Sequence, residues 1–156
     1  MRFENRSVIV TGASSGMGRA IALQFAKEGA TVIAVARRKE RLQELAAEAE
    51  SMAGKILPYP GDISSLEVNE GMIDFAVKEC GKLDVLVNNA GIMDEFKPIG
   101  EVTNEQWNQI MNINLVGPMY AMRKAVQVMC NQETGGNIVN VASIGGICGC
   151  RAGAGA

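Results

Sequence analysis

Three glycines near the start of the chain have a spacing that suits phosphate binding. Gly12, Gly16 and Gly18 follow the apolar segment 7–11 and open a helical pattern. Glycines at such a junction let the backbone approach a pyrophosphate, and a helix N-terminus offers it free N–H groups. Turn geometry alone could also explain the glycines, but their place between a strand and a helix favours dinucleotide binding. We expect the cofactor to contact these glycines and the intervening Ser14, Ser15 and Met17.

Two arginines follow the second apolar segment, residues 31–35, where a strand should give way to a helix. In dinucleotide-binding folds an acidic residue here holds the adenosine ribose of NAD, whereas an arginine accommodates the 2′-phosphate of NADP. Arg37 can make a bidentate, charge-assisted contact to phosphate, and Ser14 could add a hydroxyl. The alternative is that Arg37 and Arg38 are solvated charges, although positive charge at a helix N-terminus is mildly unfavourable. The sequence therefore predicts NADP(H), with both arginines at the phosphate.

Asn114 stands four residues before Pro118. In an α-helix the Asn114 carbonyl would accept a hydrogen bond from the N–H of residue 118, which proline lacks. We therefore expect the helix to kink there and the carbonyl to stay free to hold a water. The alternative is that Gly117 and Pro118 simply bend a helix and Asn114 is ordinary polar surface.

Composition argues against several other kinds of site. The 156 residues contain no histidine, which removes serine–histidine and cysteine–histidine nucleophilic mechanisms. The four cysteines (Cys80, Cys130, Cys148 and Cys150) lack the usual zinc spacing, so we expect apolar packing and no metal site. The net charge of −2 gives no reason to expect a nucleic-acid or membrane partner. The charged N-terminus has no signal-peptide pattern, which favours a cytoplasmic location.

Strand and helix patterns alternate along the chain. This alternation predicts parallel strands with right-handed crossovers, in one doubly wound, Rossmann-like α/β domain over residues 1–156. Pro58 and Pro60 place the third strand at an edge of the sheet. Ser64–Glu67 and Thr103–Gln106 have the pattern of capping boxes that open helices. The expected strands are residues 7–11, 31–35, 55–59, 83–88 and 137–142, and the expected helices are 16–28, 38–52, 64–80 and 103–129.

Five motifs, in order along the chain, resemble those of the short-chain dehydrogenase/reductase family. The glycine loop, Thr11-Gly12-x-x-x-Gly16-x-Gly18, has the spacing of the family's cofactor loop. Asp62 matches its adenine-pocket aspartate, and Asn88-Asn89-Ala90-Gly91 resembles its second signature. Asn114 matches the third signature, and Ser143 matches the catalytic serine.

The resemblance implies an activity and roles for these residues. It implies a sheet of seven strands, of which these residues supply five, in an NADP(H)-dependent oxidoreductase. Such an enzyme interconverts a small-molecule carbonyl and a secondary alcohol by hydride transfer, commonly as a dimer or tetramer. Ser143 would hydrogen-bond the substrate oxygen, and the Asn114 carbonyl would hold a water of the proton relay. The cofactor residues implied beyond the glycine loop and the arginines are Asp62, Ile63, Asn89, Ala90 and Gly91.

The sequence departs from the family at the proton donor. The family's Tyr-x-x-x-Lys follows the serine, but no tyrosine follows Ser143 before Ala156. We interpret Tyr120, which follows Pro118, as a helix-packing residue, and Tyr59 precedes the adenine region. A dehydrogenase truncated before this motif is the favoured hypothesis; a non-catalytic NADP(H)-binding module and a Rossmann-like interaction protein are the alternatives. We expect the 156 residues alone to bind cofactor at most, without carbonyl reduction.

Overall fold

In the computed structural model of the chain, which describes residues 1–93, 95 and 97–146, parallel strands form one five-stranded sheet. The doubly wound, Rossmann-like prediction is confirmed by the strand order β3-β2-β1-β4-β5. β3 lies at an edge and pairs only with β2, where the missing N–H groups of its prolines can be tolerated. The strands are β1 (Ser7–Thr11), β2 (Thr31–Ala36), β3 (Lys55–Pro60), β4 (Val85–Asn88) and β5 (Asn137–Asn140).

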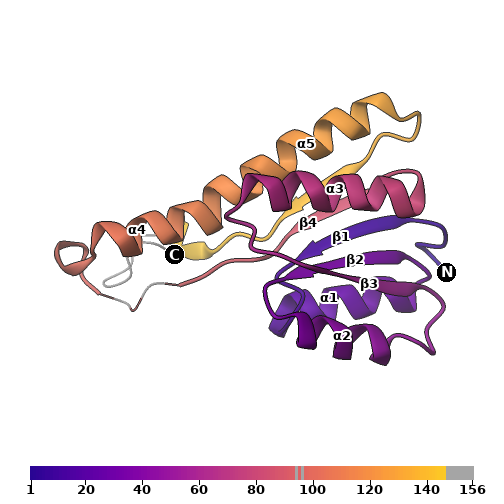
Figure 1. Cartoon of the computed structure of the whole chain (residues 1–156), viewed down its shortest axis with the longest axis horizontal. Helices are drawn as coiled ribbons and strands as arrows, with labels where there is room; N and C mark the ends of the chain where they lie inside the picture. Colours follow the sequence, from indigo (N-terminus) through magenta and orange to yellow (C-terminus); the bar gives the residue numbers. More distant parts are fainter. Residues whose placement is uncertain (94, 96, 147–156) are drawn as a thin grey trace.

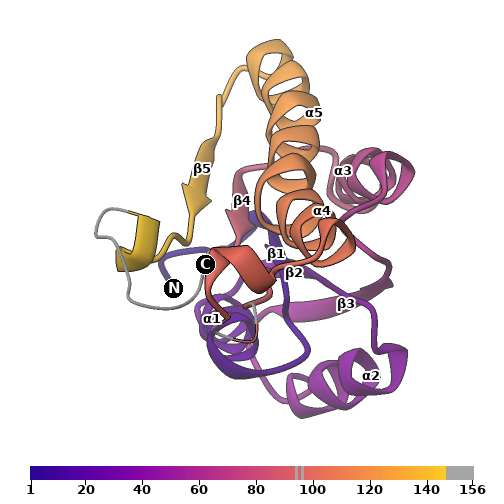
Figure 2. The same cartoon turned by 90° about the vertical axis from the view of Figure 1, so that its left-hand side faces the viewer.

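Helices cover both faces of the sheet (Figure 1). α1 (Gly16–Lys27) and α2 (Lys39–Glu48) lie on one face. α3 (Leu66–Cys80) and α5 (Gly117–Asn131) lie on the other, and α4 (Asn104–Met111) leads into α5 beyond the end of the sheet. The view along the strands in Figure 2 shows the two helical layers on opposite sides of the sheet.

Each face of the sheet has its own hydrophobic core, because successive side chains of a strand point to opposite sides. Val8 and Val10 are fully buried against Ala22 of α1 and its neighbours. Ile9, between them in the sequence, enters the second core with Met72 of α3 and its neighbours. Burial on both faces explains why the central strands are continuously apolar.

Two predicted helix starts have different outcomes. The capping box at Thr103 is confirmed, since the Thr103 and Gln106 side chains each accept the other residue's backbone N–H at 3.2 Å. The predicted box at Ser64 is wrong: α3 begins one residue later, and Ser65 is its N-cap, accepting from the Val68 N–H. Asp62 explains the shift, because its side chain accepts the Ser64 N–H at 2.9 Å and holds Ser64 in the preceding turn. α2 and β5 also end earlier than predicted, at residues 48 and 140.

The chain forms a π-helical turn, Asn112–Val116, between α4 and α5. The Gly117 N–H donates to the carbonyl of Asn112, five residues earlier. Because Pro118 has no N–H, the ordinary α-helical bond to the Asn114 carbonyl cannot form. The α-helix is therefore interrupted where the sequence predicted. The interruption is a wide turn and not the expected kink, because α4 and α5 continue along one line in Figure 1.

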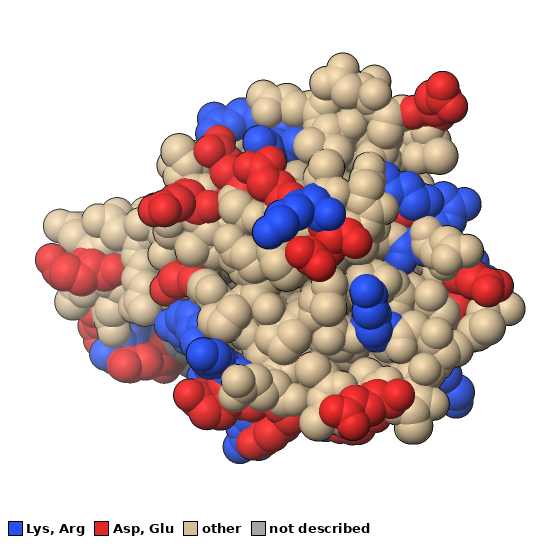
Figure 3. All heavy atoms as spheres, turned by 45° about the vertical axis from the view of Figure 1, so that its right-hand side comes forward, with Lys and Arg blue, Asp and Glu red and all other residues tan. Residues whose placement is uncertain are grey.

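The surface mixes both signs of charge on the face shown in Figure 3. Within residues 1–93, 95 and 97–146, no helix has the length and apolar character to cross a membrane. The same residues contain no cluster of three metal-ligating side chains. Cys148 and Cys150, predicted to be packing residues, lie outside this part of the chain.

Candidate functional site

The carboxyl ends of β1, β2 and β4 open into a cavity of about 410 Å³. The chain runs from β1 outward through β2 and β3 and then returns to the other side of β1 as β4. At such a switch point the loops leave towards opposite faces of the sheet, and a crevice remains between them. The residues that line the cavity are Gly12, Ser14, Ser15, Met17, Gly18, Val35, Ala36, Arg37, Arg38, Gly61, Asp62, Ile63, Asn89, Ala90, Gly91, Ile92 and Ile113.

Every predicted cofactor residue except Gly16 lines this cavity. Gly16 begins α1 with φ of +54°, a conformation that glycine adopts most easily, so it shapes the loop through its backbone. Sequence reasoning missed several apolar lining residues, notably Ile92 and Ile113. Their only signal was position, because each is adjacent to a motif residue, Gly91 or Asn114.

The glycine loop and the loop after β4 lie in direct backbone contact. A Cβ atom on Gly18 would lie 2.4 Å from the Gly12 carbonyl oxygen and 2.5 Å from Nδ2 of Asn89. A Cβ on Gly12, whose φ is +69°, would lie 2.8 Å from Cα of Ala90. No side chain fits at either position without displacing one of the two loops.

Thr11 joins the same two loops by hydrogen bonds. Its buried hydroxyl accepts the backbone N–H groups of Asn89 at 3.0 Å and Ala90 at 3.1 Å, and donates to the Val87 carbonyl at 3.4 Å. In return, Nδ2 of Asn89 donates to the Thr11 carbonyl at 3.0 Å. The ends of β1 and β4 are therefore held in register beside the cavity. Oδ1 of Asn89 is buried and has no hydrogen-bond partner among the described residues.

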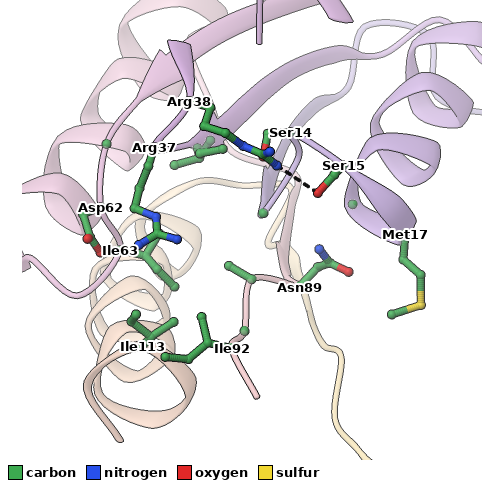
Figure 4. A pocket seen from close by; sticks show the side chains of 17 residues that line it. Ser14, Ser15, Met17, Arg37, Arg38, Asp62, Ile63, Asn89, Ile92 and Ile113 are labelled. Carbon is green, nitrogen blue, oxygen red and sulfur yellow. Dashed lines mark hydrogen bonds between the residues drawn. The ribbon is translucent and has the colours of Figure 1, made fainter. Parts of the chain in front are cut away.

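The two arginines adopt different positions around the cavity (Figure 4). Arg38 reaches across the opening and donates to the hydroxyls of Ser14 at 3.0 Å and Ser15 at 3.2 Å. Arg37 instead extends into the cavity on the side of Ile63. Thus Arg38, rather than Arg37, meets the predicted serine partner, because adjacent side chains leave an extended backbone in different directions. Neither guanidinium pairs with a carboxylate in the described part of the chain, so both positive charges remain available to an anion.

The wall beside Arg37 is mainly apolar. Ile63 and Ile113 are each more than nine-tenths buried, and Ile92 lies beside them in Figure 4. Asp62 stands at the edge of this wall, with one carboxylate oxygen bonded to the Ser64 N–H. Cationic and apolar walls together suit a phosphorylated ligand that carries a flat ring.

Asn114 holds the loop after β4 through its side chain. Its Oδ1 accepts the Ile92 N–H at 2.9 Å, and its Nδ2 donates to the Ile92 carbonyl at 2.8 Å. Asn114 does not itself line the cavity, although Ile92 does. This side-chain contact adds to the predicted role of the Asn114 carbonyl, which remains a prediction.

Ser143 follows β5 and is exposed, and its hydroxyl accepts the Gly145 N–H at 3.1 Å. The strand that precedes it is joined to β4 by a pair of asparagines: Nδ2 of Asn88 donates to Oδ1 of Asn140 at 2.9 Å, at the ends of β4 and β5. Within residues 1–93, 95 and 97–146, no hydrogen bond joins Ser143 to Asn114, and Ser143 does not line the cavity. The structure therefore places all the predicted cofactor residues except Gly16 around one cavity, whereas neither predicted catalytic residue lines it.

Tyr120 and Lys124 on α5 have Tyr-x-x-x-Lys spacing but a different environment. The Lys124 ammonium pairs with Asp74 of α3 at 2.8 Å, and this hydrogen bond raises the pKa of Lys124. The Arg123 guanidinium lies over the Tyr120 ring, 5.4 Å from its centre. Neither Tyr120 nor Lys124 lines the cavity, which agrees with a packing role for this tyrosine.

The sequence matches the short chain dehydrogenase family over residues 6–154. The chain belongs to this family. It is 38% identical over 148 residues to 3β-hydroxysteroid dehydrogenase 2 of Eggerthella lenta, covering 95% of this chain and 57% of that protein. It is 40% identical over 149 residues to the 3-oxoacyl-(acyl-carrier-protein) reductase FabG of Thermotoga maritima, covering 96% of this chain and 60% of that protein.

A solved dehydrogenase structure has the same fold. The crystal structure of an NAD⁺-bound xylitol dehydrogenase superposes with a TM-score of 0.89 at 30% identity, covering 96% of this chain and 57% of that one. The short-chain dehydrogenase thus spans less than two thirds of the length of these relatives.

Proposed function

We propose that this short-chain dehydrogenase is the cofactor-binding part of an NADP(H)-dependent oxidoreductase. The whole protein would interconvert a small-molecule carbonyl and a secondary alcohol by hydride transfer. The observation that carries the proposal is the cavity at the switch point, where the glycine loop faces two arginines that pair with no carboxylate of the described residues. The names of its relatives include a steroid dehydrogenase and an acyl-carrier-protein reductase, so the substrate is proposed only as a small carbonyl or alcohol.

The residues around the cavity fit a nicotinamide dinucleotide phosphate. Gly12 and Gly18 line the cavity, and the N-terminus of α1 favours an anion such as the pyrophosphate. Arg37 and Arg38, with the hydroxyl of Ser14, would hold the 2′-phosphate. The Oδ1 of Asn89, which has no hydrogen-bond partner among the described residues, offers an acceptor for a ribose hydroxyl.

The adenine ring would rest on the apolar wall, with the Asp62 carboxylate and the Ile63 backbone at its edge. Ala90 and Gly91 would line the path towards the nicotinamide end. When bound, the cofactor supplies or accepts the hydride. Ser143 would hydrogen-bond the substrate oxygen, and the Asn114 carbonyl would hold a water. Proton transfer requires a group beyond these residues, so the 156-residue chain should bind NADPH without reducing a carbonyl.

Exchanging the arginines should reverse the preference between NADPH and NADH. In the double variant Arg37→Asp/Arg38→Asp, the 2′-phosphate loses two charge-assisted hydrogen-bonding partners and meets two negative charges. We expect NADPH binding to weaken by roughly a hundredfold or more, while the Kd for NADH changes by less than about threefold. Isothermal titration calorimetry with both cofactors measures the ratio.

Arg41→Asp is the matched control for this exchange. Arg41 is an exposed arginine on α2 that pairs with Glu44 and does not line the cavity. Its replacement should leave both dissociation constants unchanged. An unaltered ratio of the NADPH and NADH dissociation constants in the double variant would contradict the assignment of NADP(H).

A wild-type chain that binds neither dinucleotide would favour an interaction protein, whereas binding alone is also compatible with a non-catalytic module. An intact polypeptide mass well above 16.6 kDa, measured by mass spectrometry under denaturing conditions, would support a longer enzyme.

We also propose that the chain associates with a second copy of itself through the outer face of the π-helical turn and α5. Met119 and Val126 are 40% and 47% exposed, and Leu115, four residues before Met119, is 57% exposed. Residues four and seven apart share one face of a helix, so the three form an apolar stripe. Burying this stripe against its copy would remove apolar surface from water.

Placing glutamate on the stripe should prevent this association. We expect Leu115→Glu/Val126→Glu to convert a dimer of twice the 16.6 kDa chain mass into a monomer. Light scattering coupled to size-exclusion chromatography measures the mass. Ile99→Glu, at a residue 67% exposed outside the α-helices, is the control and should leave the dimer intact. A monomeric wild-type chain at high concentration would refute the proposal.

A further inference from the structure

Asn69 is a buried polar residue that belongs to none of the motifs. It lies in the first turn of α3 and is only 1% exposed. Its side-chain nitrogen donates to the Ile63 carbonyl at 2.6 Å and to the Ser65 carbonyl at 2.7 Å. Because both partners are acceptors, the amide nitrogen must face them. The side chain thus ties α3 to the loop between β3 and α3.

The Ile63 carbonyl is held from two sides. Asn69 donates to it from α3, and Gly117 of α5 approaches it so closely that an added Cβ would lie 2.4 Å from the oxygen. The Ile63 side chain meanwhile forms part of the cavity wall, together with Ile113 in the π-helical turn before Gly117. The position of this carbonyl therefore sets the distance between the Asp62–Ile63 wall and the helices behind it.

The rest of the Asn69 side chain is not explained by packing. Its Oδ1 is buried without a hydrogen-bond partner among the described residues, which is unfavourable. An aliphatic side chain would pack in the same core without this cost. The bond to Ser65 adds little that is unique, since the Ser65 carbonyl also accepts the backbone N–H of Asn69 at 3.2 Å. The bond to Ile63 is the contact that only this side chain provides.

We propose that Asn69 is a positioning residue that holds the Asp62–Ile63 wall of the cavity in place for the adenine end of a dinucleotide. This inference rests on the proposed function of the cavity. Asn69 touches no ligand itself; it acts through the backbone of Ile63. Loss of its bond should therefore weaken binding of the adenine half of NADPH and leave the nicotinamide half unaffected.

Two variants separate this role from general stability. Asn69→Ala removes both side-chain bonds. Asn69→Ser keeps a hydroxyl that can donate to the carbonyl four residues earlier in the helix, Ser65, but is too short to bond Ile63 as well. If positioning of Ile63 matters, both variants should have the same binding defect. If only the helix start matters, serine should restore the behaviour of the wild-type chain.

Calorimetric titration of the folded chain tests the proposal, with circular dichroism as the check on folding. The ligands are NADPH, 2′-phospho-ADP-ribose and reduced nicotinamide mononucleotide. We expect the Kd values for NADPH and 2′-phospho-ADP-ribose to rise roughly tenfold in both variants, as for the loss of one well-placed hydrogen bond, and the Kd for the mononucleotide to stay unchanged. Unchanged adenine-half affinity, equal weakening of both halves, or restoration by serine would overturn the proposal.

Hydrogen exchange of the ligand-free chain gives an independent readout. The Ser64 and Ser65 amides are protected by Asp62, through its side chain and its backbone carbonyl respectively. Loosening of the loop in Asn69→Ala should speed their exchange, while amides of β1 remain protected. A wild-type chain that binds no dinucleotide would refute the proposed function, yet this exchange would still test the positioning. Unaltered exchange in both variants would overturn the positioning role itself.

Discussion

Gly18→Ala should strongly weaken NADPH binding and lower the free energy of unfolding by about 1–3 kcal/mol. The added methyl carbon would lie 2.4 Å from the Gly12 carbonyl oxygen and 2.5 Å from Nδ2 of Asn89. The first of these atoms belongs to the backbone, so the clash is relieved only if the glycine loop or α1 moves. Either movement displaces the N–H groups that face the pyrophosphate. Without two of these hydrogen bonds to the ligand, binding should weaken by at least about a hundredfold, measurable by calorimetry.

Two other glycines serve as matched controls for this substitution. At Gly16 an added Cβ meets no atom within 4 Å, but φ is +54°, so Gly16→Ala should cost about 1 kcal/mol through backbone conformation alone. At Gly100 an added Cβ also meets no atom within 4 Å, and φ is not in the left-handed region. Gly100→Ala should therefore leave the free energy of unfolding unchanged. A Gly18→Ala chain that binds NADPH as tightly as the wild-type chain would refute the close-packing explanation.

The glycine loop shows how far sequence reasoning reaches at this site. The spacing of the glycines and the apolar segment before them predicted the loop and the helix after it. The identity of the atoms that Gly18 meets could not be predicted, because Asn89 is brought there only by the pairing of β1 with β4. Pairing between strands distant in sequence depends on the whole sheet, which local patterns do not specify.

Asn114 illustrates a similar limit. Pro118 predicted an interrupted helix, and the structure has a π-helical turn there. The bonds from the Asn114 side chain to the Ile92 backbone had no signal in the sequence, because they join segments 22 residues apart. Thr11 is comparable, since its hydroxyl bonds to the loop after β4 depend on strand order. Side-chain contacts that hold one loop against another thus require the assembled fold.

Asp84 was an available signal that sequence reasoning passed over. A single carboxylate stands between Leu83 and Val85, inside an otherwise apolar segment. A charged residue in such a segment needs a specific partner to be buried. The structure provides three: the Ser7 N–H at 2.9 Å, the Arg6 guanidinium at 2.6 Å and the Lys82 ammonium at 3.1 Å. These bonds tie the start of β1 to the start of β4, at the end of the sheet opposite the cavity.

Asp84→Asn should lower the free energy of unfolding at neutral pH by about 2–3 kcal/mol, because the amide loses the charge that three donors share. The Asp84 side chain is 5% exposed, whereas Arg6 and Lys82 are partly exposed and can be rehydrated, which limits the loss. Urea denaturation measures the difference. Asp74→Asn is the matched control: this aspartate pairs with Lys124 but is 62% exposed, so its loss should stay within about 1 kcal/mol.

The difference between Asp84→Asn and the wild-type chain should also depend on pH. Burial raises the pKa of the Asp84 carboxyl, but the Ser7 N–H, Arg6 and Lys82 together lower it more, so that in the folded chain it lies below its ordinary value of 3.8. The unfolded chain then takes up the proton first as the pH falls. The stabilising contribution is complete above the ordinary pKa and is lost as the pH drops through the folded one.

The variant and the wild-type chain should therefore converge in stability once the pH has fallen below the folded pKa of Asp84, and differ by a constant amount at neutral pH. An equal difference at this low pH and at neutral pH would refute a charge-dependent role for Asp84. Because Asp84 lies at the end of the sheet opposite the cavity, the folded Asp84→Asn chain should keep the NADPH affinity of the wild-type chain. Loss of stability without loss of affinity in this variant, and loss of affinity in Gly18→Ala, would separate the residues that hold the sheet together from those that form the cofactor site.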